Sequence, residues 1–594
     1  MTLISSSISF PISFDDSSHE TGASKYLQDP STRLLVEFFR NKGLESLKQE
    51  DGREDWYQDW IDFQAQHGLY ASLLSPRQYS SRGHQFDLQK LTRFVEVFAY
   101  FSPAHAYSLH VSFLGLSVIL MSDNEPLKQE AIARLEAGEL FALAISERVH
   151  GADLFANEFA IHEGEDDGFL ADGEKYYIGN ANTAGLISVL ARTVDDERAG
   201  PTRRSDFVFF ALRPREAPGF QNVQKIRTLG VRAAFVGEFE VRNHSVVTGD
   251  LISQGRGAWD AVFATVNLGK FILGFGAIGS CSHAFAEALD HMHRRVLYGK
   301  RVTEIPHLRV ATAIAFARLS AMKLYANRAL DYLQASCADD RRYLLFTAVQ
   351  KARVSTEGVK VMTLLSECVG AWGFESETFF ESALRDMQLI PALESSTHIN
   401  FELTARFIGP YFAAADAITR PPTPPTSRDV GENLYWMEAR FRNFRTVRFA
   451  HCLDAYEPLR KVTNVDMFVG QVQAFSQFVE GGVTALRPAT DAGLHVRLGR
   501  CLSIIAYAQL VAENCAAVPA PLPLVSVIFH TLIEDLGEEA LRLAALFPVE
   551  STPRIQLKSV VRVPRTDACD FESVSEFVSD RYRLHPPASK GKTQ

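Results

Sequence analysis

The chain has 594 residues, a length that exceeds one hydrophobic core and predicts several domains. Its 46% hydrophobic and 22% charged residues are ordinary for a soluble globular protein. The formal net charge of −10 and the absence of a long basic run argue against nucleic acid as a partner. The seven cysteines lie far apart without a CxxC pair, so we expect neither a disulfide framework nor a metal site.

The first residues, MTLISSSISFPISFDD, lack the basic segment and the long apolar stretch of a secretory signal. The longest apolar runs, such as Phe271–Ile278, contain glycines and fall well short of a membrane-spanning helix. We therefore expect a cytoplasmic protein without a membrane span.

Hydrophobic patterning in the first half predicts a helical domain followed by a β domain. Residues 1–28 are Ser-rich and lack periodicity, which indicates a flexible lead-in. Residues 29–139 have apolar residues at helical spacing, as between Leu88 and Phe98, and should form an N-terminal helical domain. Residues 140–255 contain short apolar runs separated by Gly, Asp and Asn, which is typical of a small β-barrel or an orthogonal sandwich.

Helical patterning returns in the second half. Residues 256–419 contain long, largely apolar patterns that predict a helical bundle. The segment RPPTPPTSRD at residues 420–429 indicates a proline-rich linker. Residues 430–582 predict an extra C-terminal helical domain, and residues 583–594 a disordered tail. The predicted fold class is therefore mainly α with a central β domain.

A carboxylate ends an apolar run late in the bundle. Arg385 and Asp386 form a charged pair, the run from Met387 to Leu393 follows, and Glu394 ends it before three hydroxyl residues. Poor solvation raises the pKa of a carboxylate and suits it to accept a proton near neutral pH. The alternative is a first-turn glutamate that complements the dipole of the helix that follows.

Two segments of the β region resemble motifs of the acyl-CoA dehydrogenase and oxidase superfamily. Ser146–Asp153, SERVHGAD, resembles the family's TEPGAGSD turn, although a plain connection between strands is the alternative. Gly173–Ala181, GEKYYIGNA, is similar to the family's GxKxWITN strand, and Ala191–Thr193, ART, follows at the expected distance.

Two further segments lie in the helical bundle. Arg295–Lys300, RVLYGK, resembles the family's RxxFGK turn, and Glu367–Phe374, ECVGAWGF, resembles QxxGGxGY. Arg385–Asp386 matches the family's RD pair and places Glu394 where the catalytic glutamate belongs. Four segments in the family's order imply an acyl-CoA dehydrogenase-like fold, with N-terminal helical domain, small β-barrel and helical bundle, plus the extra C-terminal helical domain.

The resemblance implies α,β-dehydrogenation of an acyl thioester, carried by CoA or an acyl carrier protein, to the trans-2-enoyl thioester. Glu394 would abstract the α-proton while the β-hydrogen leaves as a hydride to N5 of FAD, because no side chain accepts two electrons reversibly. Electron-transfer flavoprotein or O₂ would accept the electrons. With O₂ the protein would be an acyl-CoA oxidase that releases H₂O₂.

The resemblance also implies which residues hold the cofactor. Ser146 would contact the flavin ring, and main-chain N–H groups of Gly151 and Ala152 would lie near the ring and the thioester. Tyr177 replaces a tryptophan that shields the flavin, and Gly179 replaces a threonine whose hydroxyl reaches N5. The implied cofactor-binding set is Ser146, Gly151, Ala152, Tyr177, Ile178, Gly179, Arg295, Tyr298, Glu367, Gly370, Ala371, Ser396 and His398.

Part of this set would act across a subunit boundary. Arg295, with Tyr298 packed beside it, would reach the FAD pyrophosphate of a neighbouring subunit, which implies a homodimer or homotetramer. The alternative is that this turn only caps a helix. Glu367 and Ala371 stand where the family has Gln and Gly against the partner's FAD.

Three residues follow the base. Ser395 replaces a glycine and would lie near the substrate, as would Ala152. Ser396 would bind a cofactor phosphate at a helix N-terminus. His398 is either a cofactor contact or a solvated helix residue.

Two other functions are open. The fold's flavin-dependent monooxygenases typically lack the base that Glu394 would supply, so this residue disfavours them. A non-catalytic scaffold that has lost FAD is suggested by Gly179, Glu367 and Ala371. Its purified protein would not be yellow.

Overall fold

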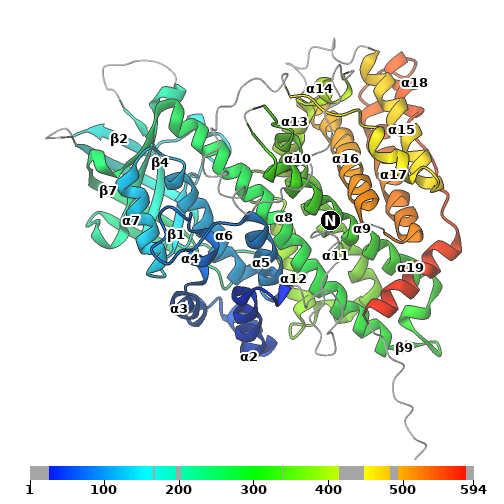
Figure 1. The fold of residues 1–594 in the computed structure, drawn as a ribbon, viewed down its shortest axis with the longest axis horizontal. Coiled ribbons are helices and arrows are strands. Elements are labelled where there is room, and N and C mark those ends of the chain that lie inside the picture. Colours follow the sequence, from blue (N-terminus) through cyan, green and yellow to red (C-terminus); the bar gives the residue numbers. More distant parts are fainter. Residues whose placement is uncertain are drawn as a thin grey trace, which may run out of the picture.

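The computed structural model describes residues 26–164, 168–194, 202–337, 339–413, 447–481, 492–518 and 520–582. The linker predicted at 420–429, the tail at 583–594 and nearly all of the lead-in at 1–28 lie outside these residues. The described chain is mostly helical, with one large sheet at one end of the molecule (Figure 1).

The N-terminal part of the described chain is helical. Its helices are α2 (Pro30–Arg53), α3 (Gln58–His67), α4 (Leu69–Leu74), α5 (Leu88–Phe101), α6 (Pro103–Leu120) and α7 (Glu125–Glu136). The Asp87 carboxylate accepts hydrogen bonds from main-chain N–H groups at the start of α5, and Ser102 caps α6 ahead of Pro103. α6 is buried along most of its length, so it runs through the interior.

Eight strands form the large sheet. They are β1 (Phe141–Ala144), β2 (Ala160–Glu163), β3 (Phe169–Gly179), β4 (Leu186–Thr193), β5 (Phe207–Leu212), β6 (Phe220–Lys225), β7 (Val236–Val246) and β8 (Leu251–Gln254). The order is β6-β7-β3-β2-β4-β5-β8, and β1 pairs in parallel with β4. Where the sequence predicts a barrel, the sheet is open, because among the described residues its end strands β6 and β8 do not pair. Register shifts in the β3–β7 ladder bend the sheet without closing it.

The bundle follows the sheet. It contains α8 (Gly255–Arg294), the hairpin strands β9 (Val296–Leu297) and β10 (Lys300–Arg301), α9 (Pro306–Gln334), α10 (Tyr343–Val349), α11 (Ser355–Val369), α12 (Phe379–Leu389), α13 (Thr397–Ala405) and α14 (Ile408–Phe412). The 40 residues of α8 span about 60 Å at 1.5 Å per residue, from the sheet to the β9–β10 hairpin (Figure 1).

Among the described residues, two helices, α6 and α8, are long and apolar enough to span a membrane by length and composition alone, although the sequence predicts shorter apolar runs. In the fold, 89% of the apolar window of α6 and 67% of that of α8 is buried. Packing in the protein interior therefore accounts for their apolar character.

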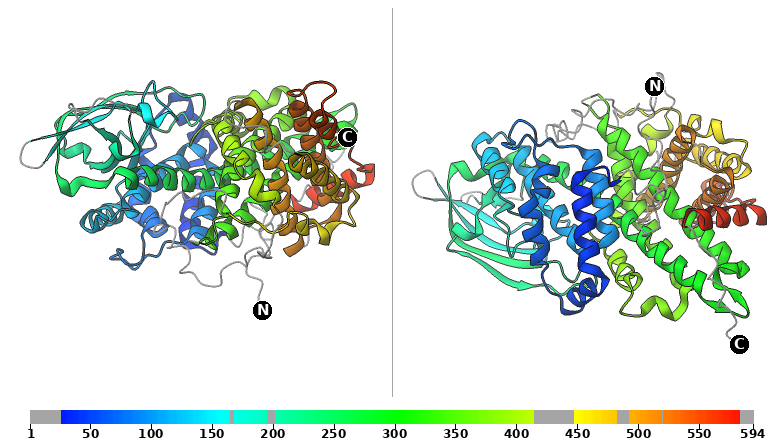
Figure 2. Two further views of the ribbon diagram at one scale, coloured as in Figure 1. Left: turned by 90° about the horizontal axis from the view of Figure 1, so that it is seen from above. Right: turned by 60° about the horizontal axis from the view of Figure 1, so that its bottom comes forward.

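The C-terminal part of the described chain packs against the bundle. Its helices are α15 (Thr463–Glu480), α16 (Ala492–Ala517), α17 (Leu522–Ala544), α18 (Thr552–Lys558) and α19 (Ala568–Arg581). Gly499 of α16 faces α13 so closely that a Cβ on it would lie 1.8 Å from the Phe401 carbonyl oxygen. Figure 2 shows that the sheet and the C-terminal helices lie at opposite ends, with the bundle between them.

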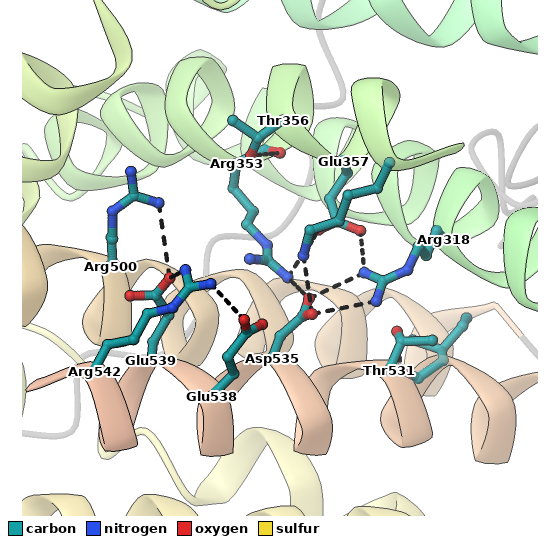
Figure 3. A network of polar contacts seen from close by, with 12 residues as sticks. Arg318, Arg353, Thr356, Glu357, Arg500, Thr531, Asp535, Glu538, Glu539 and Arg542 are labelled. Atoms are coloured by element: carbon teal, nitrogen blue, oxygen red, sulfur yellow. Dashed lines mark hydrogen bonds and ion pairs between the residues drawn. The ribbon is translucent and has the colours of Figure 1, made fainter. Parts of the chain in front are cut away.

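A buried ion network joins α17 to the bundle (Figure 3). Arg318 and Lys360 donate hydrogen bonds to Asp535 at 3.0 and 2.9 Å, and Arg353 also donates to it. Arg318 donates to Glu357 at 2.7 Å. Burial disfavours the charge on Asp535, yet the guanidinium groups of Arg353 and Arg318 hold its pKa well below the usual range. Loss of one partner would leave buried charges unpaired, so α17 is an integral part of the packed structure.

Candidate active site

Glu394 lies in the turn between α12 and α13. Glu394 and Ser395 have φ values of 51° and 71°, a left-handed conformation that is strained for residues other than glycine. The Asn400 side chain holds the turn by donating to the Ser395 hydroxyl oxygen at 3.2 Å and to the Ser396 carbonyl oxygen at 3.1 Å. α13 begins at Thr397, so Glu394 lies outside its first turn. Strain that the surrounding structure maintains is common at functional sites.

The Glu394 side chain points into the space between α6 and α8. It is 15% exposed, and its Oε1 lies 3.3 Å from Nε2 of His110 on α6. A Cβ on Gly269 of α8 would lie 3.1 Å from Glu394 Oε2. The glycine therefore makes room for the carboxylate.

Two buried lysines lie near this carboxylate. Lys270 follows Gly269 on α8, and Lys351 lies in the π-helical segment Gln350–Val354, a form that is frequent at functional sites. Burial lowers the pKa of Lys270 to about 8 and that of Lys351 to about 7, and the charge of Glu394 opposes both shifts. Lys351 donates to the Ile390 carbonyl oxygen and so fastens the turn that carries Glu394.

The turn from Ser146 to Asp153 is fastened to β3. The Ser146 hydroxyl donates to the Tyr176 carbonyl oxygen at 2.6 Å, so its proton is already used in a hydrogen bond within the protein. Glu147 and Lys175 form a buried ion pair at 3.0 Å, and burial lowers the pKa of Lys175 to about 8. Gly151 and Ala152 are exposed, and in the described residues no hydrogen bond uses their main-chain N–H groups.

The end of β3 contains one exposed side chain followed by two buried residues. Tyr177 has a φ of 65° and is 59% exposed. Ile178 is 1% exposed, so its side chain belongs to the sheet core and only its main chain could meet a cofactor. Gly179 lies against Tyr107 of α6, which in turn lies near Glu394. Tyr107 is therefore a neighbour of the end of β3 that also senses the charge of the base.

A second group of predicted residues lies at the far end of α8. Arg295 is the exposed C-cap of α8, as the alternative interpretation has it, and Tyr298 in the hairpin turn is 97% exposed. Glu367, Gly370 and Ala371 are also exposed.

The distance between the two groups follows from the helix. His291 lies in the last turn of α8, and its ring stacks on Trp372, which follows α11, with the ring centroids 4.1 Å apart. Gly269 and Arg295 are separated by about 39 Å along α8 at 1.5 Å per residue. No single flavin dinucleotide reaches both groups within one chain.

Ser396 and His398 lie next to the base turn. The Ser396 hydroxyl is 3.3 Å from His398 Nε2, and His398 is exposed to solvent. Ser396 is the N-cap of α13 but makes no side-chain capping bond. Its hydroxyl therefore pairs with His398 rather than with the main chain of α13.

Sequence reasoning missed His110, Lys270, Lys351 and Tyr107. One signal was present for Lys270, since it is the only charged residue between Ala261 and Ala286 in a long apolar pattern. The others are ordinary polar residues of helices, and nothing local marks their place beside Glu394.

Two stretches of the chain match family models. Residues 142–244 match the acyl-CoA dehydrogenase middle domain, and residues 255–409 match the acyl-CoA dehydrogenase C-terminal domain. The chain carries the middle and C-terminal domains of the acyl-CoA dehydrogenase family. The enzymes of this family are FAD-dependent oxidoreductases that act on CH–CH bonds.

Relatives agree with this assignment. Mitochondrial isovaleryl-CoA dehydrogenase of Pongo abelii is 23% identical over 368 residues, 60% of this chain and 83% of the relative. An acyl-CoA dehydrogenase of Bacillus anthracis, solved in complex with FAD, has a TM-score of 0.75 and 14% identity, covering 96% of this chain and 97% of its own. A prolyl acyl carrier protein oxidase has a TM-score of 0.55 and 18% identity, covering 65% and 99%.

The predicted acyl-CoA dehydrogenase-like fold, the resemblance to this family and FAD as the cofactor that the family binds are thereby confirmed. The Bacillus structure also covers the C-terminal helices, so the extra helical domain is part of a fold that another protein shares. The N–H groups of Gly151 and Ala152, which have no partner among the described residues, and the exposed Tyr177 near the end of β3 fit a flavin ring. Glu367 is exposed and its side chain is free to turn away from a phosphate.

Proposed function

We propose that this chain is an FAD-dependent enzyme that removes the α- and β-hydrogens of an acyl thioester, with Glu394 as the base. The observation that carries the proposal is the position of the Glu394 carboxylate. It is 15% exposed between α6 and α8, and Tyr107 connects its surroundings with the end of β3. A carboxylate held beside a flavin-binding surface matches what this reaction requires.

Different residues of the chain would abstract the proton, bind the thioester and position the base. FAD, when bound, supplies the acceptor for the β-hydride. Glu394 takes the α-proton, and its main-chain N–H, which has no partner among the described residues, is free to bind the thioester carbonyl and acidify the α-carbon. Gly151 and Ala152 offer N–H groups to the ring and the thioester. Lys351 and Asn400 hold the strained turn so that the carboxylate keeps its direction.

The test is an absorption spectrum of the purified protein, before and after anaerobic addition of a panel of acyl-CoA thioesters. We expect flavin bands that one of the thioesters bleaches. Glu394→Gln should keep the flavin and lose bleaching at least about 10³-fold, as expected for removal of a general base. Glu402→Gln, at a half-buried carboxylate on α13 that pairs with Arg406, is the matched control and should behave as the wild type.

Further outcomes separate the alternatives. Bleaching by the Glu394→Gln variant at the wild-type rate would refute the assignment of the base. Fast recolouring in air would indicate an oxidase, and slow recolouring a dehydrogenase that needs electron-transfer flavoprotein. Bleaching only by acyl groups on a carrier protein would identify that substrate. A colourless protein that does not take up FAD would support the alternative that the chain is a non-catalytic scaffold.

We also propose that two chains share each cofactor, in a homodimer or a homotetramer. The two groups of predicted cofactor residues are separated by about 39 Å along α8, so one chain alone would leave Arg295 without a role. Val296, Tyr298 and Phe374, near the outer end of α8, are 61%, 97% and 73% exposed. Large exposed apolar side chains that gather at one end of a bundle suit a subunit interface.

A further inference from the structure

Tyr107 of α6 stands where a side chain at position 179 would stand. A Cβ on Gly179 would lie 2.8 Å from Tyr107 Cε1 and 2.9 Å from the Tyr107 hydroxyl oxygen. It would also lie 2.7 Å from Cγ2 of Val111. Since real Cβ atoms essentially never come this close to other atoms, no side chain larger than hydrogen fits here while Tyr107 keeps its position. The absence of a side chain at Gly179 therefore makes room for the side chain of Tyr107.

The Tyr107 hydroxyl has no hydrogen-bond partner within the part of the chain that the structure describes. Its ring is partly buried and packs against both the helical core and the sheet core. Burial, and after it the negative charge of Glu394, raise the pKa of this hydroxyl well above its ordinary value. The group is therefore a protonated donor at neutral pH that is free to bind an acceptor of a ligand.

The side of α6 that carries Tyr107 also faces Glu394. Tyr107 and His110 are three residues apart and lie on the same side of the helix, and His110 Nε2 is 3.3 Å from Glu394 Oε1. Asn180 donates from its side chain to the Ser108 carbonyl oxygen at 2.9 Å, which fixes the end of β3 against α6. Hydroxyl, carboxylate and the end of β3 thus border one space.

We propose that Tyr107 is a catalytic hydrogen-bond donor to the flavin ring, and that it supplies from α6 the hydroxyl that Gly179 cannot supply from β3. This proposal rests on the FAD site of the proposed function, in which the end of β3 meets the ring. The edge of the ring carries nitrogen and oxygen acceptors, and a rigid helix holds the donor in place. A fixed donor at that edge changes the electron distribution of the ring and therefore its spectrum.

The variant Tyr107→Phe removes the hydroxyl and keeps the ring. We expect the holoprotein to retain its FAD content and melting temperature, to show shifted flavin absorption bands, and to bleach up to about tenfold more slowly, as for one lost hydrogen bond. Tyr79→Phe is the matched control, because it removes a remote hydroxyl that donates to Glu125. It should match the wild type in all of these measurements.

Identical flavin spectra and bleaching rates in wild type and Tyr107→Phe, both with bound FAD, would overturn the proposal. If Tyr107→Phe fails to fold or to hold FAD, the flavin spectrum of Gly179→Ala tests the proposal instead, because the added methyl group displaces the Tyr107 side chain. A shifted spectrum supports the proposal, and an unchanged one overturns it. If the wild type binds FAD but no thioester bleaches it, the proposed reaction fails, while the spectra still decide the role of Tyr107.

Discussion

Asp386 of α12 is a carboxylic acid with almost no contact with water. It is 5% exposed, and its Oδ1 accepts a hydrogen bond from the Val231 N–H at 2.6 Å. Burial raises its pKa to about 7, and the bond from Val231 only partly opposes this. A Cβ on Gly230 would lie 2.5 Å from Asp386 Oδ1, so the loop between β6 and β7 fits closely around the carboxyl group.

The raised pKa predicts how stability depends on pH. In the unfolded chain Asp386 ionises above about pH 4, whereas in the fold it stays neutral up to about pH 7, so its contribution to stability falls between these values. Asp386→Asn keeps the acceptor for Val231 and does not titrate. We expect its stability relative to wild type to rise by roughly 2–4 kcal/mol from pH 4 to pH 7 and then to level off.

Urea unfolding at a series of pH values measures this difference. Asp123→Asn, at an exposed position, is the control and should follow the wild type throughout. A constant difference between Asp386→Asn and wild type across this range would show that Asp386 is ionised in the fold, which would contradict the prediction.

At the scale of elements, the base turn depends on a helix from the C-terminal part of the chain. α13 follows the turn of Glu394, and α16 packs on α13 with only a glycine between them. A Cβ on Gly499 would lie 1.8 Å from the Phe401 carbonyl oxygen and 2.6 Å from its carbonyl carbon, and backbone atoms cannot rotate away. The close approach therefore ties the position of α13, and with it Glu394, to α16.

Gly499→Val is expected to force α16 and α13 apart. Overpacking at a backbone contact should lower the free energy of unfolding by about 1–3 kcal/mol and slow bleaching of the flavin by a thioester, because the base turn shifts with α13. Gly470→Ala on α15, where no atom lies within 4 Å of the new Cβ, is the matched control and should gain a little stability. Wild-type stability and bleaching in Gly499→Val would contradict this prediction, because α13 and α16 would then separate without a loss of folding free energy or of activity.

At the scale of the whole molecule, the 40 residues of α8 separate the proposed site into two halves. The Glu394 half lies beside Gly269, and the Arg295 half lies at the other end, next to the hairpin (Figure 1). In a symmetric dimer each half of one chain would meet the opposite half of its partner. Two defective variants should then complement each other.

Glu394→Gln and Arg295→Ala should each be inactive as pure proteins, the first with flavin and the second largely without it. A mixture unfolded and refolded together should recover about a quarter of the wild-type bleaching, since half of the dimers are hybrids with one intact site. Bleaching rate and flavin content measure this recovery. Verified hybrids with no activity beyond that of the parents would place each site within one chain.

Sequence patterns predicted the helical regions, the strand-rich middle and the family, because apolar periodicity and turn residues are local properties of the chain. The resemblance implied that Glu394 is the base, and the structure places it in a turn that is strained at two successive residues. The open sheet was not predicted, since closure depends on whether β6 and β8 meet, and neither strand contains that information. The Glu147–Lys175 pair was also missed, although Lys175 belongs to the recognised GEK segment.

By itself, the sequence determined the order of elements, and its resemblance to a known family implied the reaction class to expect and the residue to test as the base. Only the tertiary structure decided what surrounds that base. His110 is 284 residues away from Glu394 in the chain, yet their side chains are 3.3 Å apart. Such neighbours are set by which helices pack together, and packing depends on the whole distribution of apolar surface, so no local pattern could have brought His110, Lys270, Lys351 and Tyr107 to one carboxylate.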